Sequence, residues 1–212
     1  MGATVCGHRL EQSSHICAFF DSTKEEYACL VPYFQEGLAE GEQVLSIRDA
    51  AHHREHLQHL EEGGLPVKDA VHDSSFKLMA SEETYLKDQC FDHERMFSML
   101  KEALQDGQRN FTSVRTCGEM SWALRNVAGT DQLMEYEARV NTLLPEHNCT
   151  LMCVYDINKF SGKVLMDALS THRHVLVNGK IVENQYYVDP MEYLTSRLAR
   201  SSGPVAREAA EG

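Results

Sequence analysis

The stretch HICAFFDSTKEE, residues 15–26, joins a strand to a helix and decides the fold class. Its first six residues are mostly apolar, which is typical of a strand that is buried on both faces. Ser22 and Thr23 then offer side chains for a helix N-cap, and Glu25 and Glu26 follow as capping-box partners. Apolar residues continue at helical spacing, at positions 27, 30, 31, 34 and 38. A buried strand followed at once by an amphipathic helix is the first unit of an α/β fold.

The same alternation of strand and helix continues along the chain. The further predicted strands are residues 43–48, 110–117 and 150–155, and the further predicted helices are residues 51–62 and 92–106. Gly107 is expected to end the last of these helices, and Asp131 to cap another. Asn178-Gly179 lies between two short apolar runs, which predicts a tight antiparallel hairpin. The sequence therefore predicts an α/β fold in three layers, with a mainly parallel sheet whose central strand is residues 150–155.

Length and composition fit one domain with short tails. The chain has 212 residues, of which 42% are hydrophobic, and this is enough to build one sizeable core. Residues 1–12 are polar and unpatterned, and residues 199–212 are small or charged, so both segments are expected to be loose tails. The folded domain is expected to span residues 13–198.

Charge and cysteine content argue against several classes of protein. Acidic residues outnumber basic ones 32 to 20, for a net charge of −12, so direct binding to DNA or RNA is not expected. The sequence holds no apolar run close to the ~20 residues of a membrane span. The seven cysteines are scattered and include no CxxC pair, which is typical of reduced thiols in the cytoplasm and excludes a zinc ribbon.

The turn after the first strand lacks the glycines of a phosphate-binding loop. Nucleotide hydrolases wrap phosphates there with successive backbone N–H groups. Residues 21–26 contain no glycine and three carboxylates, which would repel a triphosphate. Asp156 ends the central strand, where an ATPase holds magnesium, but without the loop we expect it to cap Lys159 or the following turn. ATP hydrolysis is therefore disfavoured, and the lack of a GxSxG motif gives nucleophilic catalysis little support.

Two sets of histidines are candidate ligands. His15 and Cys17 lie two apart in a strand, so their side chains share a face and can reach one ligand or metal. The alternative is a hydrogen-bonded core histidine beside an inert thiol. His52, His56 and His59 share a helix face that could hold zinc or nickel. The alternative there is a solvated polar face.

A polar group is expected around the end of the strand 110–117. Arg115 and Glu119 flank that end, which is the usual ligand edge of a parallel sheet. Glu137 and Asn141 are spaced i, i+4 and are expected to face inward together, with Arg115 as the partner of the buried carboxylate. His172 precedes the late hairpin and is expected at the same edge. Such a network could instead serve only to stabilise the fold.

Six motifs follow one another over about residues 13 to 198. They are HICAFFD (15–21), FQEGL (34–38), GEMSW (118–122), YEARVN (136–141), CVYD (153–156) and NQYY (184–187). Together they resemble the MEDS domain, the sensory domain of the dichloromethane-responsive regulator and of methanogen and methylotroph signalling proteins. The resemblance implies a RecA-like fold related to circadian-clock and recombinase ATPases, with the phosphate loop lost. It also implies a sensor of small hydrocarbon derivatives, usually found beside a DNA-binding or histidine-kinase module.

The resemblance also implies a set of polar positions around one ligand pocket at the strand ends. The expected ligand-binding residues are His15, Cys17, Asp21, Arg115, Glu119, Trp122, Glu137, Asn141, Asp156 and His172. The sequence shows no recognisable helix-turn-helix or kinase segment, so the signal is expected to pass to a separate histidine kinase or transcription regulator. A homodimer is a further expected arrangement, and the sequence identifies no cofactor.

The first expectation is a non-catalytic small-molecule sensory domain in bacterial or archaeal signal transduction or transcription regulation. Two alternatives stay open beside it. One is a metal or haem sensor that uses His15, Cys17 or the helical histidines. The other is a RecA-like nucleotide-binding protein or hydrolase that uses Asp156, Glu119 and histidines.

Overall fold

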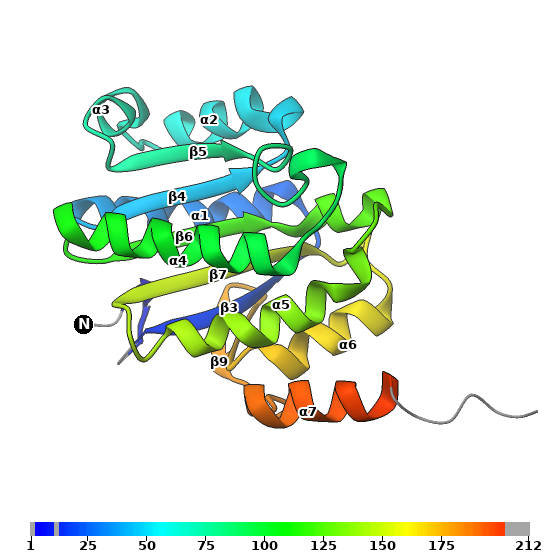
Figure 1. The fold of residues 1–212 in the computed structure, drawn as a ribbon. Coiled ribbons are helices and arrows are strands. Elements are labelled where there is room, and N and C mark those ends of the chain that lie inside the picture. Colours follow the sequence, from blue (N-terminus) through cyan, green and yellow to red (C-terminus); the bar gives the residue numbers. More distant parts are fainter. Residues whose placement is uncertain (1–2, 11–12, 202–212) are drawn as a thin grey trace, which may run out of the picture.

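A seven-stranded sheet forms the middle layer of the protein (Figure 1). The computed structural model describes residues 3–10 and 13–201. The strands are β3 (Ser14–Phe20), β4 (Gln43–Arg48), β5 (Phe76–Ala80), β6 (Val114–Glu119), β7 (Cys149–Asp156), β8 (His174–Val177) and β9 (Lys180–Glu183). They lie in the order β5-β4-β6-β7-β3-β8-β9, and each neighbouring pair is parallel except β8 and β9. The predicted mainly parallel sheet with a C-terminal antiparallel hairpin is confirmed, and β7 is its central strand.

Helices cover both faces of the sheet (Figure 1). One face carries α1 (Thr23–Ala39), α2 (His53–Glu62) and α3 (Val67–His72), and the other carries α4 (His93–Asn110), α5 (Leu133–Val140) and α6 (Gly162–Thr171). The last helix, α7 (Pro190–Ser201), packs against α5 and α6. Short 3₁₀ turns join several elements: η1 (Ala50–His52), η2 (Lys87–Gln89), η3 (Met120–Arg125), η4 (Thr130–Gln132) and η5 (Asn141–Leu143). The three-layer architecture that the alternating pattern predicts is therefore present.

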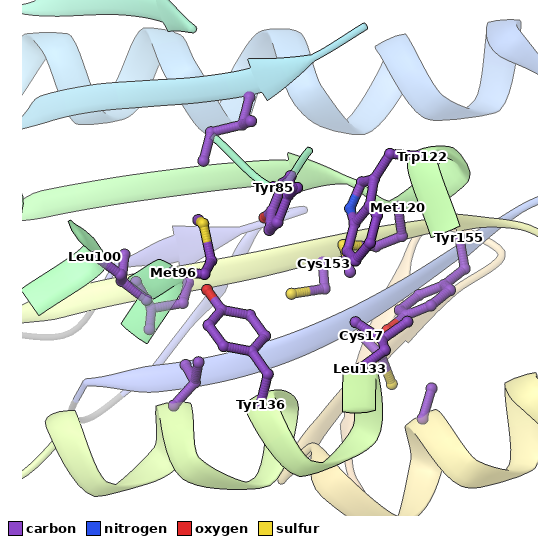
Figure 2. Packing of buried hydrophobic residues seen from close by; sticks show 14 of the residues in the cluster. Cys17, Tyr85, Met96, Leu100, Met120, Trp122, Leu133, Tyr136, Cys153 and Tyr155 are labelled. Carbon is purple, nitrogen blue, oxygen red and sulfur yellow. The ribbon is translucent and has the colours of Figure 1, made fainter. Parts of the chain in front are cut away.

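Each face of the sheet buries its own apolar core. Leu30 and Phe34 of α1 are fully buried against the strands on one face. On the other, Met96 and Leu100 of α4, Tyr136 of α5 and Cys153 of β7 belong to one buried cluster, which Figure 2 shows against the sheet. Each large apolar side chain buried in this way stabilises the fold by about 1.5–3 kcal/mol. The first seven of the eight residues of β7 are buried, as a strand covered by helices on both faces requires.

Helix α4 does not end at Gly107 but continues to Asn110, so β6 begins at Val114 and not at Asn110. An added Cβ at Gly107 would meet the side chains of Val114 and Gln43. The glycine is therefore a point of close approach between helix and sheet and not a helix terminator. Asp131 likewise lies within η4, and Gln132 takes the N-cap position of α5 with no side-chain cap hydrogen bond.

The chain ends differ from the predicted tails where the structure describes them. Residues 3–10 form a hairpin of β1 (Thr4–Val5) and β2 (His8–Arg9). It packs through Ala3 (1% exposed), Val5 (0%) and Leu10 (7%), spaced too irregularly to show as a strand pattern. Residues 199–201 belong to α7, and the rest of the predicted C-terminal tail, 202–212, lies outside the described residues. Within the described chain, no helix is long and apolar enough to cross a membrane.

Candidate functional site

The turn between β3 and α1 occupies the position of a phosphate-binding loop, but its hydrogen bonds are internal. The Asp21 N–H donates to Glu25 Oε2 at 3.1 Å, and the Glu25 N–H donates to Ser22 Oγ at 3.4 Å. Asn158 closes the turn from β7 by donating to the Asp21 carbonyl at 2.7 Å. Two backbone donors of the turn, at Asp21 and Glu25, are thus engaged by side chains of the turn and of the first helical residues.

A polar pocket of about 210 Å³ lies beside this turn, at the carboxyl ends of β3, β4, β6 and β7. The pocket is lined by Phe20, Ser22, Thr23, Glu26, Tyr27, Arg48, His52, Glu55, His56, Glu119, Ser121, Val154, Asp156 and Lys159. The carboxyl edge of a parallel sheet is where such folds bind ligands. Of the expected ligand-binding residues, Glu119 and Asp156 line this pocket.

Two ion pairs join four of the charged groups in the pocket, and one buried carboxylate lies outside both pairs. The buried Arg48 forms an ion pair with Glu26. Asp156 contacts Lys159 at 3.1 Å, as expected, and accepts from the Asn158 N–H, and these partners lower its pKa although burial alone would raise it. Glu119 is only 8% exposed and has no cationic partner among the ion pairs of the described residues, although Ser121 donates to it through N–H at 3.0 Å and Oγ at 2.6 Å. The pocket therefore presents one buried, unneutralised carboxylate.

The helical histidines do not form a shared ligand face. His56 is fully buried between α1 and β4, where Nδ1 meets the Tyr27 hydroxyl at 2.8 Å and Nε2 meets Ser46 Oγ at 3.0 Å. Burial, helped by the nearby charge of Arg48, lowers the pKa of His56 to about 2, so it is a neutral core residue. The predicted solvated face is therefore wrong for His56, because α2 turns this side chain into the sheet. In the described part of the chain, the histidines of α2 belong to no group that could hold a metal.

A second polar cluster lies inside the protein, between the sheet and α5. It joins His15 of β3, Glu137 of α5, Cys153 of β7 and His172, which precedes β8, and all four are buried. Glu137 Oε2 lies 3.2 Å from His15 Nε2, 3.5 Å from His172 Nε2 and 3.4 Å from Cys153 Sγ. His15 Nε2 is also 3.4 Å from Cys153 Sγ. Four potential ligand atoms, two nitrogens, one oxygen and one sulfur, lie within 4.8 Å of one another.

Neighbouring groups orient this cluster. The Tyr155 hydroxyl donates to Glu137 Oε1 at 3.0 Å, and His172 Nδ1 lies 2.8 Å from the Ala168 carbonyl oxygen. Burial alone would raise the pKa of Glu137, but His15 and His172 outweigh it and hold that pKa below the usual range. Burial lowers the pKa of His15 to about 4 and raises the pKa of the Cys153 thiol well above its usual value. Burial thus favours the uncharged forms of His15 and Cys153, while the contacts with the two histidines favour the ionised form of Glu137.

Arg115 is not the partner of Glu137. It points to the other face of the sheet, where it pairs with Glu42, contacts Glu36 at 3.4 Å and donates to the Tyr33 carbonyl at 2.8 Å. Successive residues of a strand point to opposite faces of the sheet. The sequence alone does not show which face α5 covers, so it could not show whether Arg115 lies on the same side as Glu137. The buried carboxylate of Glu137 contacts His15 and His172 instead. Asn141 does face inward with Glu137, and its Nδ2 donates to the Glu137 and Thr171 carbonyls.

The expected ligand-binding residues therefore occupy separate places. Trp122 stacks on Tyr85 at 4.7 Å within an aromatic core, and Asp21 is exposed on the turn. Cys17 shares a face with His15, but its Sγ is directed to the His174 carbonyl at 3.7 Å. His15 and His172 lie away from the carboxyl edge, because β8 starts opposite Ile16 and His172 comes before it.

Sequence reasoning missed Arg48, Glu26 and Ser121 in the pocket, and Cys153 and Tyr155 beside Glu137. The alternation of β7 could have placed Cys153 and Tyr155 on one face, since residues two apart in a strand point the same way. The pocket residues follow different strands of the sheet, and no motif or spacing in the sequence links them.

Comparisons with known proteins give a consistent result. The family described as MEDS, the methanogen/methylotroph, DcmR sensory domain, matches residues 14–173. The chain is 28% identical over 172 residues to the transcriptional repressor DcmR of Methylorubrum extorquens, covering 79% of this chain and 61% of that protein. It therefore spans about three-fifths of the length of this curated relative. A KaiC-like protein from Pyrococcus horikoshii superimposes with a TM-score of 0.58 at 14% identity, covering 81% of this chain and 74% of that one, which shows a shared fold alone.

Proposed function

The chain belongs to the MEDS family of sensory domains, and from this premise we propose that it binds a small molecule in the pocket beside Glu119 and passes the signal to a regulatory partner. The observation that carries the proposal is the buried carboxylate of Glu119 at the carboxyl edge of the sheet, held by Ser121 and opposed by no cation of the described ion pairs. A convergent polar group in a concave site is the usual basis of ligand selectivity.

Pocket size and charge favour a small ligand with N–H donors. A volume of about 210 Å³ is below the roughly 300–1,000 Å³ of sites for drug-sized molecules. Four carboxylates line the pocket against the cations Arg48 and Lys159, so a triphosphate would be repelled. Two amides of the β3–α1 turn, at Asp21 and Glu25, already donate to side chains and so are not available to a phosphate. A small amine or another small hydrocarbon derivative with N–H donors satisfies Glu119 better than a nucleotide does.

The proposed output is a change in contacts with a separate protein, either a transcription regulator or a histidine kinase, in the cytoplasm. The relative named as a transcriptional repressor extends beyond the part that this chain matches. Ligand binding would act on segments that leave the strand ends, namely η3 after Glu119 and the turn after Asp156. Leu124 and Ile157, each 44% exposed, lie on these two segments and are candidate contact residues for the partner.

The test is a binding titration followed by thermal unfolding and NMR chemical shifts, with methylamine, methanol, dichloromethane and Mg-ATP as probes. We expect saturable binding of methylammonium, weaker binding of the two neutral probes and none of Mg-ATP. Glu119→Gln keeps the shape of the side chain and removes its charge, so we expect it to weaken methylammonium binding at least tenfold, in line with the ~1.5–3 kcal/mol of a charged hydrogen bond.

Glu102→Gln is the matched control, because Glu102 is an exposed carboxylate on α4 outside the pocket. It should bind methylammonium like the original chain. Tight binding of Mg-ATP, or equal binding of all probes by the Glu119→Gln variant, would contradict the proposal.

A further inference from the structure

The buried cluster of His15, Glu137, Cys153 and His172 has the composition of a metal site. Each residue comes from a different part of the chain, and their ligand atoms converge on one point between β3, β7 and α5. We propose that these four residues bind one divalent transition-metal ion, best fitted by Zn²⁺, through both histidine Nε2 atoms, the Cys153 thiolate and Glu137 Oε2. This site is separate from the pocket beside Glu119, and the proposal does not depend on the ligand bound there.

The first argument comes from the hydrogen bonds of His172. Its Nδ1 lies 2.8 Å from the Ala168 carbonyl oxygen, which can only accept, so Nδ1 carries the proton. In the neutral ring, Nε2 then presents a lone pair to Glu137 Oε2 at 3.5 Å, and Nε2 has no hydrogen-bond partner among the described residues. Two buried acceptors that face each other repel unless a proton or a metal ion lies between them. The ring is thus oriented as a second-sphere carbonyl orients a metal-binding histidine.

Distances form the second argument. Zinc binds sulfur at about 2.3 Å and nitrogen or oxygen at about 2.0–2.2 Å in a tetrahedron, so its ligand atoms lie about 3.3–3.8 Å from one another. Four of the six separations between the ligand atoms, 3.2, 3.4, 3.4 and 3.5 Å, lie in or next to this range, and the other two are no longer than 4.8 Å.

Charge balance is the third argument. Glu137 is fully buried, and none of the ion pairs within the described residues joins it to Lys or Arg. An isolated carboxylate is costly in such a place. A dication held by one carboxylate, one thiolate and two neutral imidazoles is uncharged overall, and a coordinated thiol loses its proton readily. The proton of the Cys153 thiol leaves to solvent when the ion binds.

The residues around the cluster fit a closed metal site that borders a cavity. All four ligands come from the protein and the Tyr155 hydroxyl holds Glu137, as in structural zinc sites with a supporting outer sphere. His15 and Asn141 also line a cavity of about 600 Å³ at the start of β3. In the described structure His15 Nδ1 and Asn141 Oδ1 are buried without hydrogen-bond partners. Through His15, this cavity borders the cluster at the amino end of the sheet.

The test uses the full chain, stripped with a chelator under reducing conditions and titrated with Co²⁺ and then Zn²⁺. We expect one ion per chain, a thiolate-to-cobalt charge-transfer band, the intense visible bands of four-coordinate cobalt, and displacement of cobalt by zinc. Saturating zinc should raise the melting temperature by about 5–10 °C. No charge-transfer band in the original chain, or less than one half-equivalent of bound ion at saturation, would overturn the proposal without any variant.

Two variants locate the ion. Cys153→Ser should remove the charge-transfer band and weaken binding more than ~100-fold, and His172→Gln should weaken it similarly. Cys149→Ser is the matched control, since Cys149 is a buried thiol on the same strand outside the cluster. It should keep the band and the affinity. Unchanged cobalt spectra in both Cys153→Ser and His172→Gln would place the metal elsewhere and refute the assignment.

Discussion

Glu137 shows how one residue sets the chemistry of the protein interior. It is fully buried, yet its four polar neighbours are two imidazoles, a thiol and a phenol, and none of them is a lysine or an arginine. The rings of His15 and His172 contact each other with centroids 4.0 Å apart and planes tilted by 40°, and the Nε2 atoms of both lie within 3.5 Å of the carboxylate. The negative charge of a buried carboxylate can be neutralised by a proton, a basic side chain or a metal ion. Imidazole, thiolate and carboxylate groups are common ligands of transition metals.

Removing the Tyr155 hydroxyl tests the outer sphere of the proposed metal site. Tyr155→Phe deletes the donor to Glu137 Oε1 and leaves the ring packing against Phe160 in place. We expect zinc affinity to fall about 10–100-fold, because outer-sphere partners orient the ligand carboxylate. Competition with a chromophoric chelator measures the change. Tyr33→Phe is the control, because Tyr33 donates to backbone carbonyls on the opposite face of the sheet. The zinc affinity of this variant should not change.

His56 predicts a pH dependence of stability. Burial lowers its folded-state pKa to about 2, and the groups that face it are Tyr27 and Phe34 of α1, Ser46 and Arg48 of β4, and His53 and His59 along α2. Because the unfolded chain takes up this proton near pH 6.5 and the folded chain does not, stability falls as the pH drops below 6.5. The loss from this group is about 2 kcal/mol between pH 7 and pH 5.

Urea unfolding at the two pH values checks this expectation. His56→Gln removes the titration while keeping groups that can bond Tyr27 and Ser46, so its stability should drop by about 2 kcal/mol less over the same interval. His8→Gln, an exposed histidine on β2, is the control and should behave like the original chain. Equal pH slopes for the original chain and the His56→Gln variant would show that His56 is not buried in its neutral form.

At the scale of the elements, Gly107 determines how closely α4 approaches the sheet. Gly107→Ala places a methyl group against Val114 and Gln43, and we expect a loss of about 1–3 kcal/mol from overpacking. Gly162→Ala is the matched change, at the first residue of α6 where an added Cβ meets nothing within 4 Å. This variant should be unchanged or slightly more stable, since alanine favours the helix. Denaturant unfolding of both variants measures the contrast, and equal effects would contradict this role of Gly107.

Several elements with a clear hydrophobic period could be predicted from the sequence, whereas β5, α3, α6 and α7 were not. The buried runs of β3, β4 and β7 and the Asn178-Gly179 hairpin follow from local patterns. β5 was missed because it is short and exposes Lys77, and α3 because it has only six residues. Side-chain pairing was harder. Whether Glu137 meets Arg115 or His15 depends on which face of the sheet α5 covers, and no local pattern in the sequence specifies this.

On the scale of the whole molecule, the two candidate sites lie along the same central strands. β7 carries Cys153 in the buried cluster and Asp156 in the pocket at the carboxyl edge, while β3 carries His15 at its start and leads into the pocket turn at its end. β3 and β7 are paired in register along their whole overlap, from Ser14 opposite Thr150 to Phe20 opposite Asp156. An ion that fixes the cluster would therefore also stiffen the frame from which the pocket is built.

Hydrogen exchange tests this view of the whole molecule. The cluster joins residues up to 157 positions apart, from His15 to His172, so removal of the ion should free β3, β7, α5 and the segment before β8 together. We expect faster amide exchange in these elements after chelation, and little change in β4 and β5, which contribute no ligand. The Cys153→Ser variant, with and without chelator, is the control and should show no difference. A uniform change over the whole sheet, or protection that is unaffected by chelation in the original chain, would show that the cluster does not hold these elements together.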